Sequence, residues 1–293
     1  MNTQSLIALF YSVDEFCILF EQHWHRHLLE LQVHPSRWWQ TRISQLCLSE
    51  LMTITIFFHQ SKYRTFKHYY LYCVLGPLKP LFPNAPSYVR FISLMKGIPF
   101  PLFMLQNAFK GASEGLAFID STILSVSHIC RASSHRVFKK IAAKGKTSTG
   151  WFFGMKLHLV INHRGEILSW LLTPGNVSDV TAAPQLCLGL FGKLCGDRGY
   201  VSSKLFETLC ERGIQLITRL RSNMKNMLMD MWDKMLLYKR GIIESVIHQL
   251  KSVCQIDHHR HRSPIHFFVN LVAGLVAYSF CVQKPELQDV WVQ

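Results

Sequence analysis

The sequence predicts an α/β fold, in which a mixed sheet flanked by helices follows a helical N-terminal region. Three observations support this fold class: helical patterning over the first hundred residues, a partly alternating apolar stretch at 149–162, and alternating strand-like and helix-like segments after it. The chain of 293 residues is long enough for one large domain or two of ordinary size. Its 49% apolar and 17% charged residues exclude global disorder.

The N-terminal region, residues 1–110, is predicted to be helical. Apolar residues from Leu46 to Phe57 lead into the basic-aromatic stretch SKYRTFKHYY, and a Pro-rich break at 76–86 precedes the helix-like SYVRFISLMKG. Short helices separated by turns, with cations between aromatic rings, favour a helix-turn-helix-like DNA-binding region. A helical cap packed on the next domain explains the pattern equally well.

The basic-aromatic stretch supplies candidate contacts to phosphate. Its cations alternate with the rings of Tyr63, Phe66 and Tyr69. The candidate DNA-binding residues of this region are Lys62, Arg64 and Lys67.

Residues 111–283 are predicted to form the α/β domain, and 284–293 a tail. The short apolar run GLAFIDST ends in a carboxylate. A strand at 149–162, a turn and the returning strand GEILSWLLTPG follow. Five further elements complete the domain. They are a helix at 182–190, a second short strand in KLCGDRGY, a helix at 202–213, a strand at 214–220 and a helix at 236–254. An antiparallel start followed by alternating α and β elements is the order of a ribonuclease H-like fold.

The charge balance points to an anionic partner. Lys and Arg number 32 against 18 Asp and Glu, which gives a formal net charge of +14. Nucleic acid is the first expectation, and an acidic membrane surface the second. A soluble basic protein without such a partner is the remaining alternative.

Cysteine spacing and the apolar segments indicate a cytoplasmic protein without membrane contact. None of the nine cysteines forms a C-x-x-C pair, so we expect reduced, core-filling thiols. The N-terminus has no basic stretch before its apolar residues, unlike a signal peptide. The uncharged segment from Ser263 to Gln283 is expected to be a buried helix beginning near Pro264, because its apolar run is shorter than the roughly 20 residues of a membrane span.

Two aspartates are candidate metal ligands. Asp120 ends one predicted strand, and Asp197 ends another between Gly196 and Gly199. Carboxylates at the ends of adjacent buried strands are costly unless a cation neutralises them, and their hard oxygens suit Mg²⁺ or Mn²⁺. The alternative roles are an N-cap to a following turn for Asp120 and a turn residue for Asp197.

Glu244 is a candidate third carboxylate. On a helix, Arg240, Glu244, His248 and Lys251 fall within a stripe about 80° wide, opposite an apolar face. The stripe fits either a solvated row of ion pairs or a metal-binding carboxylate beside cations that face DNA.

Several long segments resemble the bacterial insertion-sequence transposases of the IS982 family. They are FIDST, TSTGWFFGMKLHLVINHRGEIL, TPGNVSD, GDRGYVSSKLFETLCERGIQLITRLRSNMKN, KRGIIESVIHQLK and HHRHRSPIHFFVNLVAGLVAYSF, and with SKYRTFKHYY the resemblance runs from about Leu46 to Phe280.

The resemblance implies a catalytic Asp-Asp-Glu (DDE) triad on a ribonuclease H-like fold. The triad corresponds to Asp120, Asp197 and Glu244, while Arg240 and Lys251 match the spacing of the family's Arg and Lys. It also implies terminal inverted repeats and target DNA as partners, and a homodimer or larger assembly. Because the family's soluble fold includes the C-terminal helix, the resemblance argues against a membrane span there.

The expected chemistry is metal-dependent cleavage at the element's ends, followed by strand transfer into target DNA. Phosphodiester chemistry of this kind commonly uses two metal ions, so we expect two Mg²⁺ ions, with Mn²⁺ as substitute. The alternative is a decayed, catalytically inactive transposase that only binds DNA.

Overall fold

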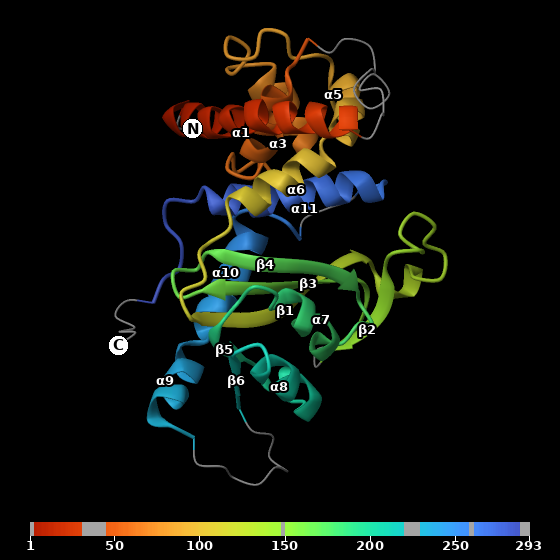
Figure 1. Ribbon diagram of the computed structural model, residues 1–293. Helices are drawn as coiled ribbons and strands as arrows, with labels where there is room; N and C mark the ends of the chain where they lie inside the picture. Colours follow the sequence, from red (N-terminus) through yellow and green to blue (C-terminus); the bar gives the residue numbers. More distant parts are fainter. Residues whose placement is uncertain (1–2, 31–44, 148–149, 220–228, 258–260, 288–293) are drawn as a thin grey trace. The chain divides into compact units, whose positions relative to one another are not determined.

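The computed structural model describes residues 3–30, 45–147, 150–219, 229–257 and 261–287. The chain forms two compact units (Figure 1). The first comprises Met1–Phe109 and Leu250–Cys281, and the second comprises Lys110–Gln249 and Val282–Gln293.

The described part of the first unit is helical. Its helices are α1 (Thr3–Glu30), α3 (Leu48–Phe58), α4 (Phe66–Tyr69) with a π-helix at Tyr70–Val74, α5 (Tyr88–Leu94), a 3₁₀ turn at Met95–Gly97, α6 (Pro99–Ala108) and α11 (Pro264–Ser279). Whether they form a helix-turn-helix stays a prediction.

Helix α11 lies in the core of the first unit, where it packs against α3 and α6. It was expected to be buried, and it is, but the sequence analysis assigned it to the α/β domain. The helix is apolar on all sides, so a neighbouring layer of helices must cover each face. Gly274 permits close packing, because a Cβ there would lie 2.4 Å from Cγ2 of Ile256.

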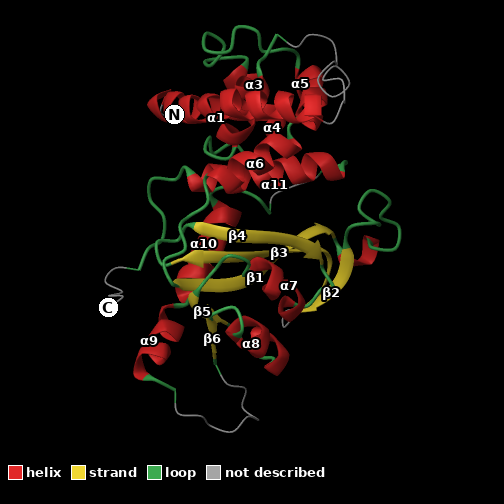
Figure 2. Cartoon of the chain, viewed as in Figure 1, coloured by secondary structure: helices red, strands yellow, loops and turns green. Residues whose placement is uncertain are grey.

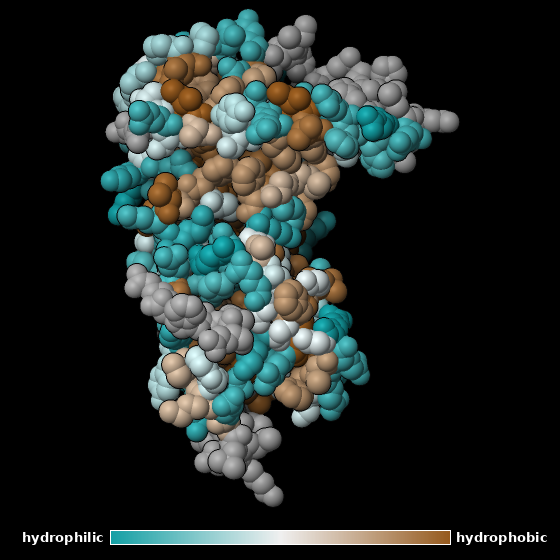
Figure 3. Space-filling model, turned by 60° about the vertical axis from the view of Figure 1, so that its left-hand side comes forward, coloured by the Kyte–Doolittle hydropathy of each residue, from teal (hydrophilic) through white to brown (hydrophobic). Residues whose placement is uncertain are grey.

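Helix α1 lies in the region predicted to be helical, although no individual helix was predicted there, and it exposes several apolar side chains. By length and composition alone, α1 could cross a membrane. The bent helix pair Tyr88–Gly97 and Pro99–Ala108 would also pass this test if the two helices counted as one span. The core helix of a soluble protein can be equally long and apolar, so this finding does not decide whether the protein contacts a membrane. The absence of membrane contact stays a prediction. Figure 3 shows exposed apolar atoms on this unit; those of α1 and α6 include Ile7, Tyr11, Ile18, Leu19, Phe100, Phe103 and Met104.

The rings of the basic-aromatic stretch differ in burial, from the buried Tyr69 to the half-buried Phe66. Tyr69 is fully buried, and its hydroxyl donates to the carbonyl of Ile54 at 3.1 Å. The ring of Phe66 packs against Phe58 and Phe91. The cations between these rings were predicted to contact phosphate; they are exposed, and their contact with DNA stays a prediction.

The second unit is built on a six-stranded mixed sheet (Figure 2). Its strands are β1 (Leu116–Ser127), β2 (Ala143–Thr147), β3 (Gly150–Asn162), β4 (Ile167–Pro174), β5 (Gly192–Gly196) and β6 (Ile214–Thr218). The order is β2-β3-β1-β5-β6, with β4 also paired to β3. The β1–β3, β2–β3 and β3–β4 pairs are antiparallel, whereas β1–β5 and β5–β6 are parallel.

The described helices of this unit are α7 (Asp179–Leu186), α8 (Ser203–Cys210), α9 (Met231–Lys239) and α10 (Gly241–Ser252), which continues into the first unit. Apolar side chains of α7 and α8 form one core with the face of the sheet that carries Ile119 and Val160. The single helix predicted at 236–254 is instead two helices that meet at Arg240 and Gly241. Glycine is unfavourable inside a helix, and here it begins α10.

Candidate active site

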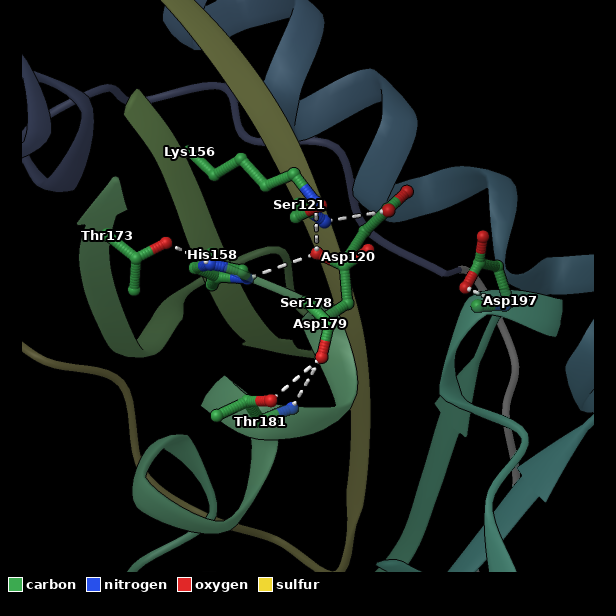
Figure 4. Close-up of polar contacts among 10 residues, drawn as sticks. Asp120, Ser121, Lys156, His158, Thr173, Ser178, Asp179, Thr181 and Asp197 are labelled. Carbon is green, nitrogen blue, oxygen red and sulfur yellow. Dashed lines mark hydrogen bonds and ion pairs between the residues drawn. The ribbon is translucent and has the colours of Figure 1, made fainter. Parts of the chain in front are cut away.

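Asp120 lies inside β1, not at its end. The strand was predicted to stop at this residue, but it continues for seven residues to Ser127 because β3 pairs with it over that length. On its other side β1 runs parallel to β5, with Phe118 opposite Cys195. Asp120 and Asp197 each lie two residues beyond that pair, so the two carboxylates share one end of the parallel strands (Figure 4).

Asp197 directly follows β5 and begins a short 3₁₀ turn. Its Oδ1 accepts a hydrogen bond from the backbone N–H of Gly199 at 2.8 Å. A Cβ on Gly199 would lie 2.9 Å from that oxygen, so glycine permits the close approach. Asp197 therefore acts as a turn residue, which was the alternative role predicted for it. Its Oδ2 takes no part in this hydrogen bond.

The Asp120 carboxyl is electrostatically perturbed. Burial raises its pKa to about 6, and the charge of Asp197 adds to the rise. The backbone N–H of Ser121, which donates to Oδ1 at 2.7 Å, and the Arg240 guanidinium act in the opposite direction. A buried carboxyl beside a like charge is a site that favours a nearby cation.

Arg240 joins two members of the predicted triad. Its Nη1 donates to Oδ2 of Asp120 at 3.1 Å, and its Nη2 donates to Oε1 of Glu244 at 2.5 Å. Arg240 ends α9, and Glu244 lies in the first turn of α10, so the break between these helices positions the guanidinium. The sequence analysis expected Arg240 to contact phosphate; in the structure it pairs with the carboxylates.

A cleft of about 420 Å³ opens beside these residues. Its charged lining consists of Asp197, Arg198, Arg219, Arg240 and Glu244. Arginine forks bind phosphate oxygens in bidentate fashion, so three of them beside carboxylates suit a phosphodiester.

The sequence analysis missed two of these arginines. Arg198 directly follows Asp197, and Arg219 directly follows β6, so position after a strand could have indicated both. The Arg219 guanidinium lies 5.7 Å from the ring centroid of Tyr238.

Tyr200 was also missed. Its side chain is buried, and its hydroxyl has no hydrogen-bond partner among the described residues. Burial raises its pKa, and the charges of Asp179, Asp120 and Asp197 add to that effect. The phenol therefore lies in the field of three carboxylates.

Asp179, the first residue of α7, is a further carboxylate, and Figure 4 shows its contacts. Its Oδ1 lies 3.4 Å from both Nζ of Lys156 and Nδ1 of His158. Nε2 of His158 lies 2.8 Å from Oγ1 of Thr173. Burial lowers the pKa of His158 to about 4, with Lys156 adding to the fall and Asp179 opposing it.

The other predicted DNA-binding residues belong to the first unit, whereas the carboxylate cluster belongs to the second. Lys62, Arg64 and Lys67 are exposed, as a phosphate contact requires. Lys251 lies 3.5 Å from the carboxylate of Asp257, so this cation has an acidic partner within its own unit.

The carboxylates fit a divalent cation by donor chemistry. In the described part of the chain, no group of three or more His, Cys, Asp or Glu side chains is arranged to hold a metal ion. Yet the hard oxygens of Asp120, Asp197 and Glu244 are the donors that Mg²⁺ and Mn²⁺ prefer. Such an ion would offset the electrostatic repulsion between the carboxylates of Asp120 and Asp197.

Comparison with known proteins places the chain in a family. Among solved structures it is similar to a piggyBac transposase in a synaptic complex with hairpin DNA, determined by cryo-electron microscopy, with a TM-score of 0.46 and 8% identity. That match covers 78% of this chain and 62% of the piggyBac chain. A comparison with curated proteins finds no match. Residues 110–264 match the family described as "Transposase DDE domain". Because this match covers more than half of its length, the chain belongs to the DDE-domain family of transposases.

Proposed function

We propose that this protein is an active insertion-sequence transposase of the IS982 type, which cleaves DNA at the ends of its element and joins them to target DNA. The observation that carries the proposal is that Arg240 bonds both Asp120 and Glu244, while Asp197, Arg240 and Glu244 line one cleft. The carboxylates come from β1, the end of β5 and α10.

The strand order supports a ribonuclease H-like fold for the second unit. Three antiparallel strands, β4, β3 and β1, are followed by the parallel strands β5 and β6. Such a fold has its acidic residues on the central strand and its parallel neighbour. Asp120 lies within β1 and Asp197 directly follows β5, which supports the proposed fold.

The triad would hold Mg²⁺ or Mn²⁺, which would activate the attacking oxygen and neutralise charge on the scissile phosphate. We expect two such metal ions to bind. Asp120, Asp197 and Glu244 provide the oxygen donors. Burial keeps Asp120 poorly hydrated, so its charge is available to a bound cation rather than to water.

The arginines of the cleft would position the phosphodiester. Arg198 and Arg219 have exposed side chains, and Arg240 is partly buried beside Asp120. The first two would donate to non-bridging oxygens, while Arg240 would hold Asp120 and Glu244 in place until DNA and metal are bound.

The proposal extends to DNA partners, assembly and location. The first unit would recognise the terminal inverted repeats through Lys62, Arg64 and Lys67, and Lys251 would add a phosphate contact. Two or more copies would bridge the ends. None of its nine cysteines, all of them described, is in a disulfide bond, which fits action at the nucleoid in the cytoplasm.

Strand cleavage in Mg²⁺ tests the proposal. Asp120→Asn, Asp197→Asn and Glu244→Gln each remove a negative ligand at nearly constant volume, so each should reduce nicking of a duplex that carries the element's end at least 100-fold. Glu211→Gln, which alters an exposed carboxylate after α8, is the matched control and should cleave normally.

End binding distinguishes the outcomes. All three triad variants should retain end binding, because they keep the cations. A wild-type protein that binds ends but never nicks them, in Mg²⁺ or Mn²⁺, would identify a decayed transposase and refute the enzymatic proposal.

A further inference from the structure

The most basic stretch of the chain lies outside the site described so far. Residues 121–165 contain eight Lys and Arg and no Asp or Glu, against a net charge of +14 for the whole protein. Six of these cations occur between β1 and the end of β2, in a segment that we name the basic insertion (residues 128–147). They are Arg131, Arg136, Lys139, Lys140, Lys144 and Lys146.

All six cations are exposed, and no ion pair joins them to a carboxylate within the described part of the chain. A row of like charges that lacks acidic partners repels itself unless an anion lies against it. The insertion therefore presents an uncompensated positive surface.

The insertion is folded onto the sheet rather than trailing from it. Phe138 is buried, and its N–H donates to Nδ1 of His135 at 3.3 Å. The His135 ring lies 5.7 Å from that of Phe153 on β3. Figure 1 shows the segment as the yellow-green loop that leads into β2. Its backbone can thus hold cations in fixed positions, which reduces the entropy lost on binding.

Strand register places part of this surface on the same face of the sheet as Asp120. Asp120 pairs with Leu159, and side chains along β3 alternate, so Phe153 and Trp151 share that face. Lys144 pairs with Phe153, and Lys146 with Trp151. The lysines and the catalytic carboxylate therefore project to one side.

Trp151 completes the surface. Its side chain is 61% exposed, and Nζ of Lys146 lies 5.7 Å from a ring centroid. An exposed indole beside a lysine offers an apolar contact to the sugar or base next to a bound phosphate.

The spacing suits duplex DNA that continues from the cut. From Asp120 to Ser127, β1 extends for about 23 Å at roughly 3.3 Å per residue. That length corresponds to about seven base pairs at 3.4 Å each. A duplex whose scissile phosphate lies at Asp120 would reach the insertion along one flank.

We propose that the basic insertion binds the phosphate backbone of duplex DNA about seven base pairs from the cleavage point, independently of its sequence. The proposal rests on the transposase function argued above, because that function places DNA at Asp120. Four of the six cations are lysines, which act as point charges. The insertion has no Asn, Gln, Asp or Glu, residues that read adenine and cytosine edges.

Salt-dependent binding tests the proposal on the full-length protein. The variant Lys144→Ala/Lys146→Ala should flatten the log–log slope of affinity against salt by about two units, because each lysine releases about one counterion. The matched control is Lys204→Ala/Lys234→Ala, which removes two exposed lysines elsewhere in the same unit and should leave the slope unchanged. Lys144→Arg/Lys146→Arg should retain the wild-type slope.

Two duplex probes of about 30 base pairs are needed, one with the element's end and one of random sequence. The insertion proposal expects equal losses on both. An unchanged slope in the alanine variant, a loss confined to the end-containing duplex, or a loss of binding to phosphatidylglycerol vesicles without loss on DNA would each overturn it.

A length series and a cleavage assay complete the design. Duplexes with fewer than about seven base pairs beyond the cut on each side should show no difference between the wild type and the alanine variant. Normal cleavage with an unchanged slope would refute only the insertion surface. A wild type that never cleaves, combined with the expected change in slope, would refute only the enzymatic proposal. Equal thermal unfolding midpoints would show that the variants are folded.

Discussion

Nη1 of Arg240 lies 3.1 Å from Oδ2 of Asp120, and the same guanidinium bonds Glu244. The cation between the two carboxylates is thus supplied by the protein itself. Because a guanidinium and a divalent metal ion neutralise the same charge, we expect them to compete for these oxygens.

Arg240→Gln should therefore raise Mn²⁺ affinity at pH 8 roughly fivefold, the equivalent of about 1 kcal/mol for a partly exposed ion pair. Cleavage should nevertheless fall, because the alignment of the Asp120 and Glu244 carboxylates is lost. Electron paramagnetic resonance measures free Mn²⁺, and Arg212→Gln is the control on an exposed arginine. A lower Mn²⁺ affinity in Arg240→Gln would contradict competition.

Asp120→Asn should stabilise the metal-free protein at pH 7.5, by an amount on the order of 1 to 3 kcal/mol. The folded-state pKa is raised from 3.8 to about 6, so the native protein holds a proton that the unfolded chain releases in this window. Wild-type stability therefore falls relative to the Asn variant as pH rises from 3.8 to 6. Urea unfolding at pH 3.5 and 7.5 measures the difference, and an equal difference at both values would contradict this account.

Tyr200→Phe should leave the free energy of unfolding unchanged or raise it by up to about 1 kcal/mol. The hydroxyl that it removes is buried and has no hydrogen-bond partner among the described residues. Tyr69→Phe is the matched control: this hydroxyl is equally buried but donates to Ile54, so the variant should lose about 1 to 2 kcal/mol. If Tyr200→Phe were the more damaging variant, the phenol would have to make a hydrogen bond in solution.

His59 should make the protein less stable in acid. Burial lowers its folded-state pKa from 6.5 to about 4, although its bond to the Cys254 carbonyl opposes the fall. The unfolded chain then binds more protons between pH 6.5 and 4, so stability falls as pH decreases through that window. His59→Gln should show a smaller fall between pH 7 and 4.5 in urea titrations. Parallel curves for the two proteins would contradict a titrating His59.

The cations of the first unit should govern recognition of the ends. Replacing Lys62, Arg64 and Lys67 by Ala should lower affinity for an end-containing duplex about tenfold or more relative to random DNA. The exposed cations lie beside buried rings, so the substitutions should leave the fold intact. Anisotropy titrations with both duplexes measure the ratio. Equal losses on the two would mean that these residues contact only the phosphate backbone.

Lys251 should contribute less to DNA binding than its place in the predicted motif suggests. Its ammonium lies 3.5 Å from Asp257, so binding DNA would require giving up that partner. Lys251→Ala should flatten the salt slope by less than one unit, whereas Asp257→Asn should strengthen binding. A full unit lost in Lys251→Ala would show that the lysine prefers phosphate.

Local patterns in the sequence determined most of the second unit. Alternating apolar residues at 149–162 and the turn after them predicted β3 and β4, and the match was close. Gly196 and Gly199 on either side of Asp197 marked a sharp turn after a strand, which is where the residue lies. These features depend on neighbouring residues, so they can be predicted without the fold.

Contacts between residues distant in sequence decided the rest. Pairing with β3 extends β1 beyond Asp120, and pairing with β5 brings Asp197 level with it. The apolar α11 belongs to the first unit because α3 and α6 cover it there.

The site shows the same division between sequence and tertiary structure. The residue types and spacing of Asp120, Asp197 and Glu244 were sufficient to nominate them as candidates. Folding determined that Arg240 bridges two of them, because its two bonds join residues separated by 120 positions in one case and four in the other. Burial and charge at a site arise from the whole fold, and local sequence does not specify them.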